Sequence, residues 1–267
     1  MSTAQVRVKR QRRSWRDIAQ ALGRSHRKAR PHLAASLPLL QHLEELRRRL
    51  FRALVALVIT TALSFTLVEP LMDYLTGPIG GRAALVSIEV TENIAIFMRV
   101  SLLGGIALGL PVVVYEAIAF ILPGLTPGER RWLLFSVPLA TLLFLSGVAF
   151  TWFVMLPVAV PFLTSFLGIT TQVRPSNYFG FITSLMFWIG VSFEMPLAAM
   201  ILARLNLITA RQLARGWRYA IVGIALVASA ITPTVDPVNM GLVMLPLMAL
   251  YGVSILLAAL ARRGRRG

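Results

Sequence analysis

The sequence predicts an all-α, polytopic membrane protein with six transmembrane helices, and three observations point to this fold class. First, 57% of the 267 residues are apolar and only 14% are charged, which lies outside the range of soluble globular proteins. Second, the apolar residues gather into runs long enough to form membrane helices. Third, the basic residues fall almost entirely in the short polar stretches between these runs, as the orientation of a membrane protein requires.

Six apolar runs are the predicted membrane helices. Crossing a bilayer takes about 20 helical residues. The fifth run has only about fifteen, so we expect the membrane to be thinner beside the fifth and sixth helices. In chain order, the predicted spans are residues 51–68, 94–122, 132–155, 178–202, 217–231 and 240–261.

The stretches between the spans carry structural signals of their own. Residues 39–50 have apolar side chains at three- and four-residue spacing, which predicts an amphipathic helix that runs into the first span. Prolines and glycines predict a loop over about 70–93, and Thr91-Glu-Asn93 at its end favours a helix start. Residues 158–167 are apolar but too few to cross, so we expect an interfacial segment there.

The predicted domain organisation is a basic arm, a membrane domain and a short tail. Residues 1–37 are rich in Arg and Lys and lack apolar runs, so we expect a cytoplasmic arm that is disordered or lies on anionic headgroups. Arg12-Arg13 in this arm is not followed closely by an apolar segment, which argues against a cleavable signal. Residues 38–261 form the six-helix membrane domain, and residues 262–267 form a basic tail.

The charge distribution predicts the orientation of the chain. If both termini lie on one side, every Lys and Arg except Arg82, Arg99 and Arg174 falls on that side. Because loops rich in Lys and Arg stay in the cytoplasm, we expect a multi-pass protein of the cytoplasmic (inner) membrane with both termini in the cytoplasm. The net charge of +16 therefore reflects membrane topology rather than nucleic-acid binding.

Cys and His, which many enzymes and metal sites use, are missing from the predicted spans. The chain has no Cys, and its three His residues all precede the first span. The sequence has no nucleophile motif, no His-Glu metal motif and no glycine-rich phosphate loop. We therefore predict a protein that is not an enzyme and that has no cofactor or bound metal.

One carboxylate, that of Glu194, lies near the middle of the fourth span. An ionised carboxylate in hydrocarbon costs at least roughly 2.5 kcal/mol, so it normally faces a bundle interior, a water-filled cavity or a partner. Pro196 predicts a kink in the same helix because proline lacks the amide N–H. The alternative is that Glu194 pairs with a neighbouring helix and serves only packing.

Two further carboxylates are expected at headgroup depth on the cytoplasmic side. Glu45 precedes the first span, and Glu129 lies in the turn between the second and third spans. Two acids among so many arginines either pair internally or bind a cation. A purely structural role stays open for both, because Glu45 can pair with Arg49, and Thr126 and Glu129 have the spacing of a helix capping box.

Four sequence blocks together resemble the TatC family, the polytopic receptor subunit of the twin-arginine protein translocase. They occur in the order and spacing of that family, and the resemblance spans about residues 38–260, leaving the arm 1–37 outside it. The blocks are residues 42–47 (His-Leu-Glu-Glu-Leu-Arg), 120–125 (Phe-Ile-Leu-Pro-Gly-Leu) with Glu129-Arg130, 193–196 (Phe-Glu-Met-Pro), and 232–237 (Thr-Pro-Thr-Val-Asp-Pro).

The resemblance implies a cup-shaped bundle, with short fifth and sixth helices, that recognises folded proteins carrying an Arg-Arg signal peptide. Glu45 and Glu129 would receive the two arginines, because guanidinium groups match carboxylates in a two-pronged arrangement that lysine cannot copy. The other residues implied at this site are Arg47, Pro123, Leu125 and Arg130.

The same resemblance implies a second contact surface, for single-span subunits of the TatA or TatB type. Glu194 would contact a polar residue in the partner's transmembrane helix, and homo- and hetero-oligomers in the lipid membrane are expected. The residues implied at this surface are Phe193, Glu194, Pro196, Thr232, Pro233 and Asp236.

The chain departs from the family pattern in its last span. Tyr251-Gly252 stands where the family often has a Glu after an aromatic residue, and Asn239-Met240 stands where a Ser-Gln-like pair is common. These departures affect the expected polar contacts of the sixth helix, not the signal-peptide site.

Two other functions compete with a translocase receptor. A proton- or ion-coupled carrier would use Glu194 and Glu116 as titrating groups, but the chain shows no internal repeat and few membrane acids. An intramembrane hydrolase would need a paired nucleophile and base, and the spans contain no His or Cys.

Overall fold

The computed structural model describes residues 31–122, 127–165, 172–232 and 237–263, although for residues 31–40, 129, 165, 262 and 263 it describes the backbone alone. The chain divides into two units, residues 1–50 and 51–267.

The described part of the first unit is helical. Helix α2, Pro31–Ser64, begins with a proline, whose missing amide N–H costs nothing at the first position of a helix. The helix therefore starts upstream of residue 38, where the sequence predicted the membrane domain to begin. On its surface Arg48 pairs with Glu44 and Arg49 pairs with Glu45, each four residues apart.

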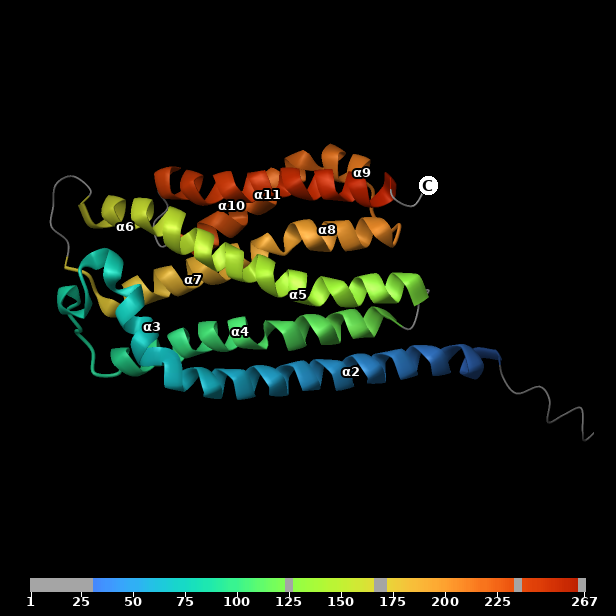
Figure 1. Ribbon diagram of the computed structural model, residues 1–267, viewed down its shortest axis with the longest axis horizontal. Coiled ribbons are helices and arrows are strands. Elements are labelled where there is room, and N and C mark those ends of the chain that lie inside the picture. Colours follow the sequence, from blue (N-terminus) through green and yellow to red (C-terminus); the bar gives the residue numbers. More distant parts are fainter. Residues whose placement is uncertain (1–30, 123–126, 166–171, 233–236, 264–267) are drawn as a thin grey trace, which may run out of the picture. The chain divides into compact units, whose positions relative to one another are not determined.

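The described part of the second unit is also almost entirely helical (Figure 1). Among all the described residues, five helical stretches are long and apolar enough to cross a membrane, and α10 is a shorter apolar helix of 15 residues, so the six-helix prediction is confirmed. After α2 the elements are η1 (Phe65–Leu67), α3 (Val68–Leu75), η2 (Gly77–Ile79), η3 (Arg82–Ala84), α4 (Glu92–Ile121), α5 (Pro127–Phe150), the π-helical turn η5 (Thr151–Met155), α6 (Leu156–Ser165), α7 (Pro175–Phe193), α8 (Met195–Arg204), α9 (Ala210–Arg215), α10 (Trp217–Ile231) and α11 (Pro237–Arg263).

Three long helices, α4, α5 and α7, lie side by side (Figure 1), and α7 supplies more buried residues to the apolar core than any other helix. Small residues let α5 and α7 approach closely. A Cβ atom added to Gly147 would lie 2.9 Å from the Cα of Gly190, and one added to Gly190 would lie 2.7 Å from the ring of Phe144. Glycine at these positions therefore sets the distance between the helices, as small residues commonly do in membrane bundles.

A glycine also allows the part of α2 beyond residue 50 to approach α4 closely. A Cβ atom on Gly105 would collide with both the side chain and the Cα of Thr61. The hydroxyl of Thr60 donates a hydrogen bond of 2.8 Å to the Gly105 carbonyl, which makes the close approach favourable.

Two local expectations are wrong, and a third gains detail. Residues 158–165, the described part of the expected interfacial segment, are helical, because α5 continues through η5 into α6. The predicted loop over 70–93 overlaps α3, in which Pro70 occupies the first turn, where it breaks no helical hydrogen bond. The sixth membrane helix is not short, since α11 has 27 residues.

The C-terminal part of the unit pairs α8 with α11 and places α9 against α11 (Figure 1). Thr209 and Gln212 form a reciprocal capping box that starts α9. The Tyr251 hydroxyl on α11 donates a 2.5 Å hydrogen bond to the Leu213 carbonyl of α9. The residue at one of the departures from the family pattern therefore links α11 to the short helix α9.

Candidate functional site

Glu45 is a partly exposed carboxylate on α2. Its side chain is 32% exposed, and Arg49 binds it through two nitrogens, Nε at 3.0 Å and Nη2 at 2.6 Å. Both nitrogens donate to the same oxygen, Oε1. Among the described residues no donor reaches Oε2, so one edge of the carboxylate can accept a further cation. Arg47 is exposed on the same helix.

The other residues predicted around Glu45 lie in or next to the start of α5. Glu129 lies in the first turn of that helix, and Arg130 follows it with an exposed side chain. Pro123 and Leu125 fall outside the described residues, and so does the side chain of Glu129, including its predicted capping box. A groove shared by Glu45 and Glu129 therefore stays a prediction.

Glu194 marks a break between two helices. Helix α7 ends at Phe193 and α8 begins at Met195, with the buried Pro196 in the first turn of α8. The predicted kink is therefore present, and the interruption falls on the residue that carries the carboxylate.

The carboxylate of Glu194 is incompletely satisfied within the described part of the chain. The residue is partly buried, and its Oε1 atom is buried without a hydrogen-bond partner there. The adjoining Phe193 ring packs against Phe150 of α5 with centroids 5.7 Å apart. A buried acceptor without a donor is costly, and a donor supplied by another chain would remove that cost.

Thr232 is the described member of the predicted 232–236 contact surface. It ends α10 in an extended conformation, is 7% exposed, and donates its hydroxyl to the Ala228 carbonyl at 3.0 Å. Its visible role is to terminate the short helix. Pro233 and Asp236 lie outside the described residues.

Glu116, the second acid of the competing carrier hypothesis, is already compensated. Its side chain is 8% exposed and lies 3.0 Å from the guanidinium of Arg52 on α2. An acid that already has a counterion on a neighbouring helix does not favour the carrier hypothesis.

Glu92, a buried acid that was not among the predicted site residues, lies at the other end of α4, where it forms several contacts. It is 3% exposed and accepts hydrogen bonds from the Nε of Arg174, from the Ser176 and Ile88 amides, and from the Ser87 hydroxyl. Arg174 also binds Glu89 at 2.6 Å. The hydrogen bonds to Glu89 and Glu92 raise the pKa of Arg174 above its usual value.

This cluster joins the start of α4 to the start of α7. The sequence signal was limited to an acid at the beginning of a helix, because its partners are more than eighty residues away in the chain. Because these residues are far apart in the sequence, the contact that fixes the register of the two membrane helices could not be predicted.

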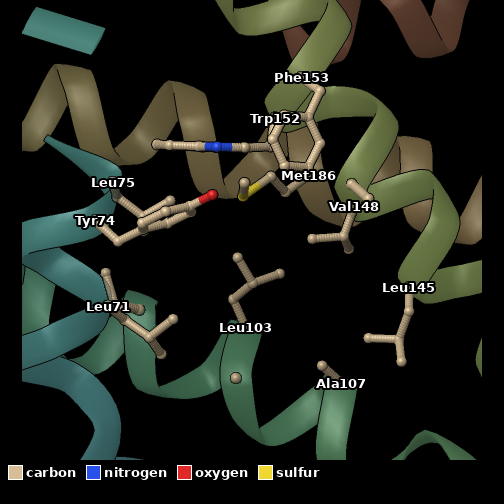
Figure 2. A pocket seen from close by; sticks show the side chains of 13 residues that line it. Leu71, Tyr74, Leu75, Leu103, Ala107, Leu145, Val148, Trp152, Phe153 and Met186 are labelled. Carbon is tan, nitrogen blue, oxygen red and sulfur yellow. The ribbon is translucent and has the colours of Figure 1, made fainter. Parts of the chain in front are cut away.

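An apolar cavity of about 260 Å³ lies between α3, α4, α5, η5 and α7. Figure 2 shows Leu103 of α4 pointing into it, with Tyr74 and Trp152 stacked at its edge, their ring centroids 4.3 Å apart. Its lining carries no ionisable group other than the Tyr74 phenol. Such a surface can hold apolar groups but offers no acid–base or nucleophilic chemistry.

The part of the chain that the structure describes holds no cluster of three or more metal-ligating side chains. What it does offer is two carboxylates that can accept a further donor, Glu45 on α2 and Glu194 at the α7–α8 break. This arrangement suits recognition of cationic or donor groups.

Comparison with known proteins identifies the scaffold. The sequence model of the family described as Sec-independent protein translocase protein (TatC) matches residues 41–246. A Sec-independent protein translocase protein TatC from Deinococcus radiodurans is 38% identical, over 88% of this chain and 90% of its own length. The TatC protein of Carboxydothermus hydrogenoformans is 31% identical, over 83% and 93% respectively.

A solved structure agrees with these sequence relatives. The crystal structure described as twin arginine translocase receptor TatC matches with a TM-score of 0.74 and 31% identity, covering 83% of this chain and 100% of that one. The family predicted from the four sequence blocks is therefore confirmed. This chain belongs to the TatC family and is a multi-pass membrane component of the Sec-independent protein translocase.

Proposed function

We propose that this chain is the non-enzymatic receptor subunit of the translocase. It binds Arg-Arg signal peptides of folded precursors on its cytoplasmic face and nucleates assembly with single-span TatA- or TatB-type subunits. It lies in the cytoplasmic membrane with both termini in the cytoplasm. Family membership and the one-sided distribution of Lys and Arg support this placement.

The observation that carries the signal-peptide proposal is the open edge of the Glu45 carboxylate. Arg49 holds Oε1 and thereby fixes the orientation of the carboxylate, while Oε2 is left for an incoming guanidinium. Glu129 is the second acid of the proposed pair. Arg47, Pro123, Leu125 and Arg130 form the surroundings of the site in this proposal.

An arginine pair suits two such carboxylates better than a lysine pair. A guanidinium group presents planar, parallel N–H donors that match the oxygens of a carboxylate, whereas an ammonium group is a point charge. Loss of one charge-assisted interaction at the site is expected to cost about 1.5–3 kcal/mol, or roughly ten- to hundredfold in affinity.

Site-directed crosslinking of a precursor to the full chain in membrane vesicles tests this proposal. We expect Glu45→Ala and Glu129→Ala each to abolish crosslinking of an Arg-Arg precursor, and a Lys-Lys precursor to crosslink poorly to the unchanged chain. Glu44→Ala is the matched control, because Glu44 is 70% exposed and its contact with Arg48 is a loose 3.6 Å. Crosslinking that survives both substitutions would overturn the proposal.

The proposal for partner assembly rests on Glu194 at the α7–α8 break. Its unsatisfied Oε1 can accept a hydrogen bond from a polar side chain in a single-span partner helix. Phe193, Pro196 and the 232–236 segment, with Thr232, Pro233 and Asp236, form the adjoining contact surface in this proposal.

Co-purification with a TatA- or TatB-type subunit tests the role of Glu194. We expect Glu194→Ala to reduce recovery of the subunit while Glu194→Gln, which keeps an acceptor oxygen, retains part of it. Normal recovery with Glu194→Ala at normal expression would exclude this contact. We propose no carrier function, because Arg52 already compensates Glu116.

A further inference from the structure

Arg99 is a cation without a counterion in the described part of the chain. Of the three arginines predicted on the non-cytoplasmic side, Arg82 pairs with Asp73 and Arg174 pairs with Glu89 and Glu92. Within the described ranges, no hydrogen bond, ion pair or ring contact engages the Arg99 guanidinium. Glu92, a nearby acid on the same helix, has both of its oxygens occupied.

Arg99 belongs to α4, and its guanidinium lies against the backbone of α7, beside a cavity. A Cβ atom added to Gly180 would lie 2.5 Å from its Nη1 atom, so the absence of a side chain at Gly180 makes room for the charge. The cavity between α4 and α7 has a volume of about 390 Å³. Besides Arg99, two hydroxyl residues, Thr183 and Ser184, line the cavity. The rest of the lining is apolar: Leu102, Leu103, Ile106, Phe187 and Trp188.

The depth of this site can be read from the helices. α4 has 30 residues, which corresponds to about 45 Å, close to the thickness of a bilayer including its headgroups. The starts of α4 and α7 lie together, since Glu92 accepts a hydrogen bond from the Ser176 amide at 2.8 Å. Arg99 is two helical turns from that end, at about 10 Å, which is near the boundary between headgroups and hydrocarbon.

The side chain also extends in the direction of the headgroups. Side chains on a helix lean towards its N-terminus, and the start of α4 is the near membrane surface. The guanidinium accordingly reaches Gly180, which is closer to the start of α7 than Thr183 and Ser184 are. Long basic side chains near helix ends adopt this arrangement to reach the phosphate layer.

We propose that Arg99 and this cavity bind one anionic phospholipid. The phosphate diester pairs with the guanidinium, and the upper part of an acyl chain lies against the apolar wall formed by Leu102, Ile106 and Trp188. The lining contains no acid, so the cation of a zwitterionic headgroup finds no partner there, which favours an anionic lipid. This inference needs only a membrane-spanning chain and does not depend on signal-peptide binding.

Native mass spectrometry of the full chain in neutral detergent tests the proposal by titration with phosphatidylglycerol or phosphatidylcholine. We expect a single tight site for phosphatidylglycerol, weakened roughly tenfold by Arg99→Gln and less by Arg99→Lys. The matched control is Arg211→Gln, since Arg211 is an exposed arginine on α9 that lines none of the described cavities, and it should bind lipid like the unchanged chain.

A second variant protects the test against misfolding. Gly180→Ala keeps the charge but forces the guanidinium to move, so it should weaken phosphatidylglycerol binding while the protein stays monodisperse. Equal phosphatidylglycerol affinity for Arg99→Gln and the unchanged chain would overturn the proposal. Displacement of the lipid by inorganic phosphate at the same concentration would also overturn it, by showing that the apolar wall contributes nothing.

Discussion

Arg52 on α2 and Glu116 on α4 form a 3.0 Å ion pair in which the guanidinium is half exposed and the carboxylate is buried. The pair joins the first membrane helix to the second from positions more than sixty residues apart. Because the carboxylate lies in a membrane helix, its counterion bears directly on stability.

We expect Arg52→Ala to lower the free energy of unfolding by roughly 1–3 kcal/mol, since it removes a charge-assisted hydrogen bond from a buried acid. Thermal unfolding in detergent measures the change. Arg48→Ala serves as the control because its pair with Glu44 is exposed on both sides, and such pairs contribute about 0–1 kcal/mol. Equal shifts for the two variants would contradict the prediction.

The close approach of α2 to α4 gives a second prediction. Gly105→Ala places a methyl group against the Thr61 backbone and should displace the helices, at a cost of about 1–3 kcal/mol. The loss should appear in thermal unfolding. The matched control is Gly223→Ala on α10, where no atom lies within 4 Å of the new methyl group and stability should stay the same or rise by up to about 1 kcal/mol.

The Glu92–Arg174 cluster predicts that charge geometry, not charge alone, holds the starts of α4 and α7 together. Arg174→Lys keeps the charge but cannot bind Glu89 and Glu92 through separate nitrogens, as Nη2 and Nε of Arg174 do. We expect a lower unfolding temperature for Arg174→Lys than for Glu89→Gln, because Glu89 is 63% exposed and Glu92 is buried. An unchanged unfolding temperature for Arg174→Lys would show that a point charge is sufficient.

Much of this architecture follows from the sequence, because membrane helices are specified by local apolar runs. The short helix 217–231 was predicted with the same bounds as α10, and Thr91-Glu-Asn93 marked the start of α4 within one residue. The sequence did not predict that α5 continues through a π-helical turn into α6, because the two prolines of α6 are typical of loops.

The parts of the sites that could not be predicted depend on pairings between distant residues. Nothing local in the sequence connects Glu92 with Arg174, or Arg52 with Glu116. The break at Glu194 was predictable, because a proline two residues later constrains the helix locally. That its Oε1 atom lacks a donor is a property of the assembled helices.

The contact of Tyr251 with α9 gives the last prediction. Tyr251→Phe removes the hydroxyl that donates to the Leu213 carbonyl, and the expected loss is about 1 kcal/mol, concentrated in α9 and its connection to α10. Hydrogen exchange of residues 210–216 should therefore become faster while exchange in α4 and α7 stays the same. Tyr219→Phe is the control, since Tyr219 is 85% exposed and no described residue bonds its hydroxyl. Faster exchange spread over all helices would instead mean that Tyr251 supports the whole bundle rather than the attachment of α9.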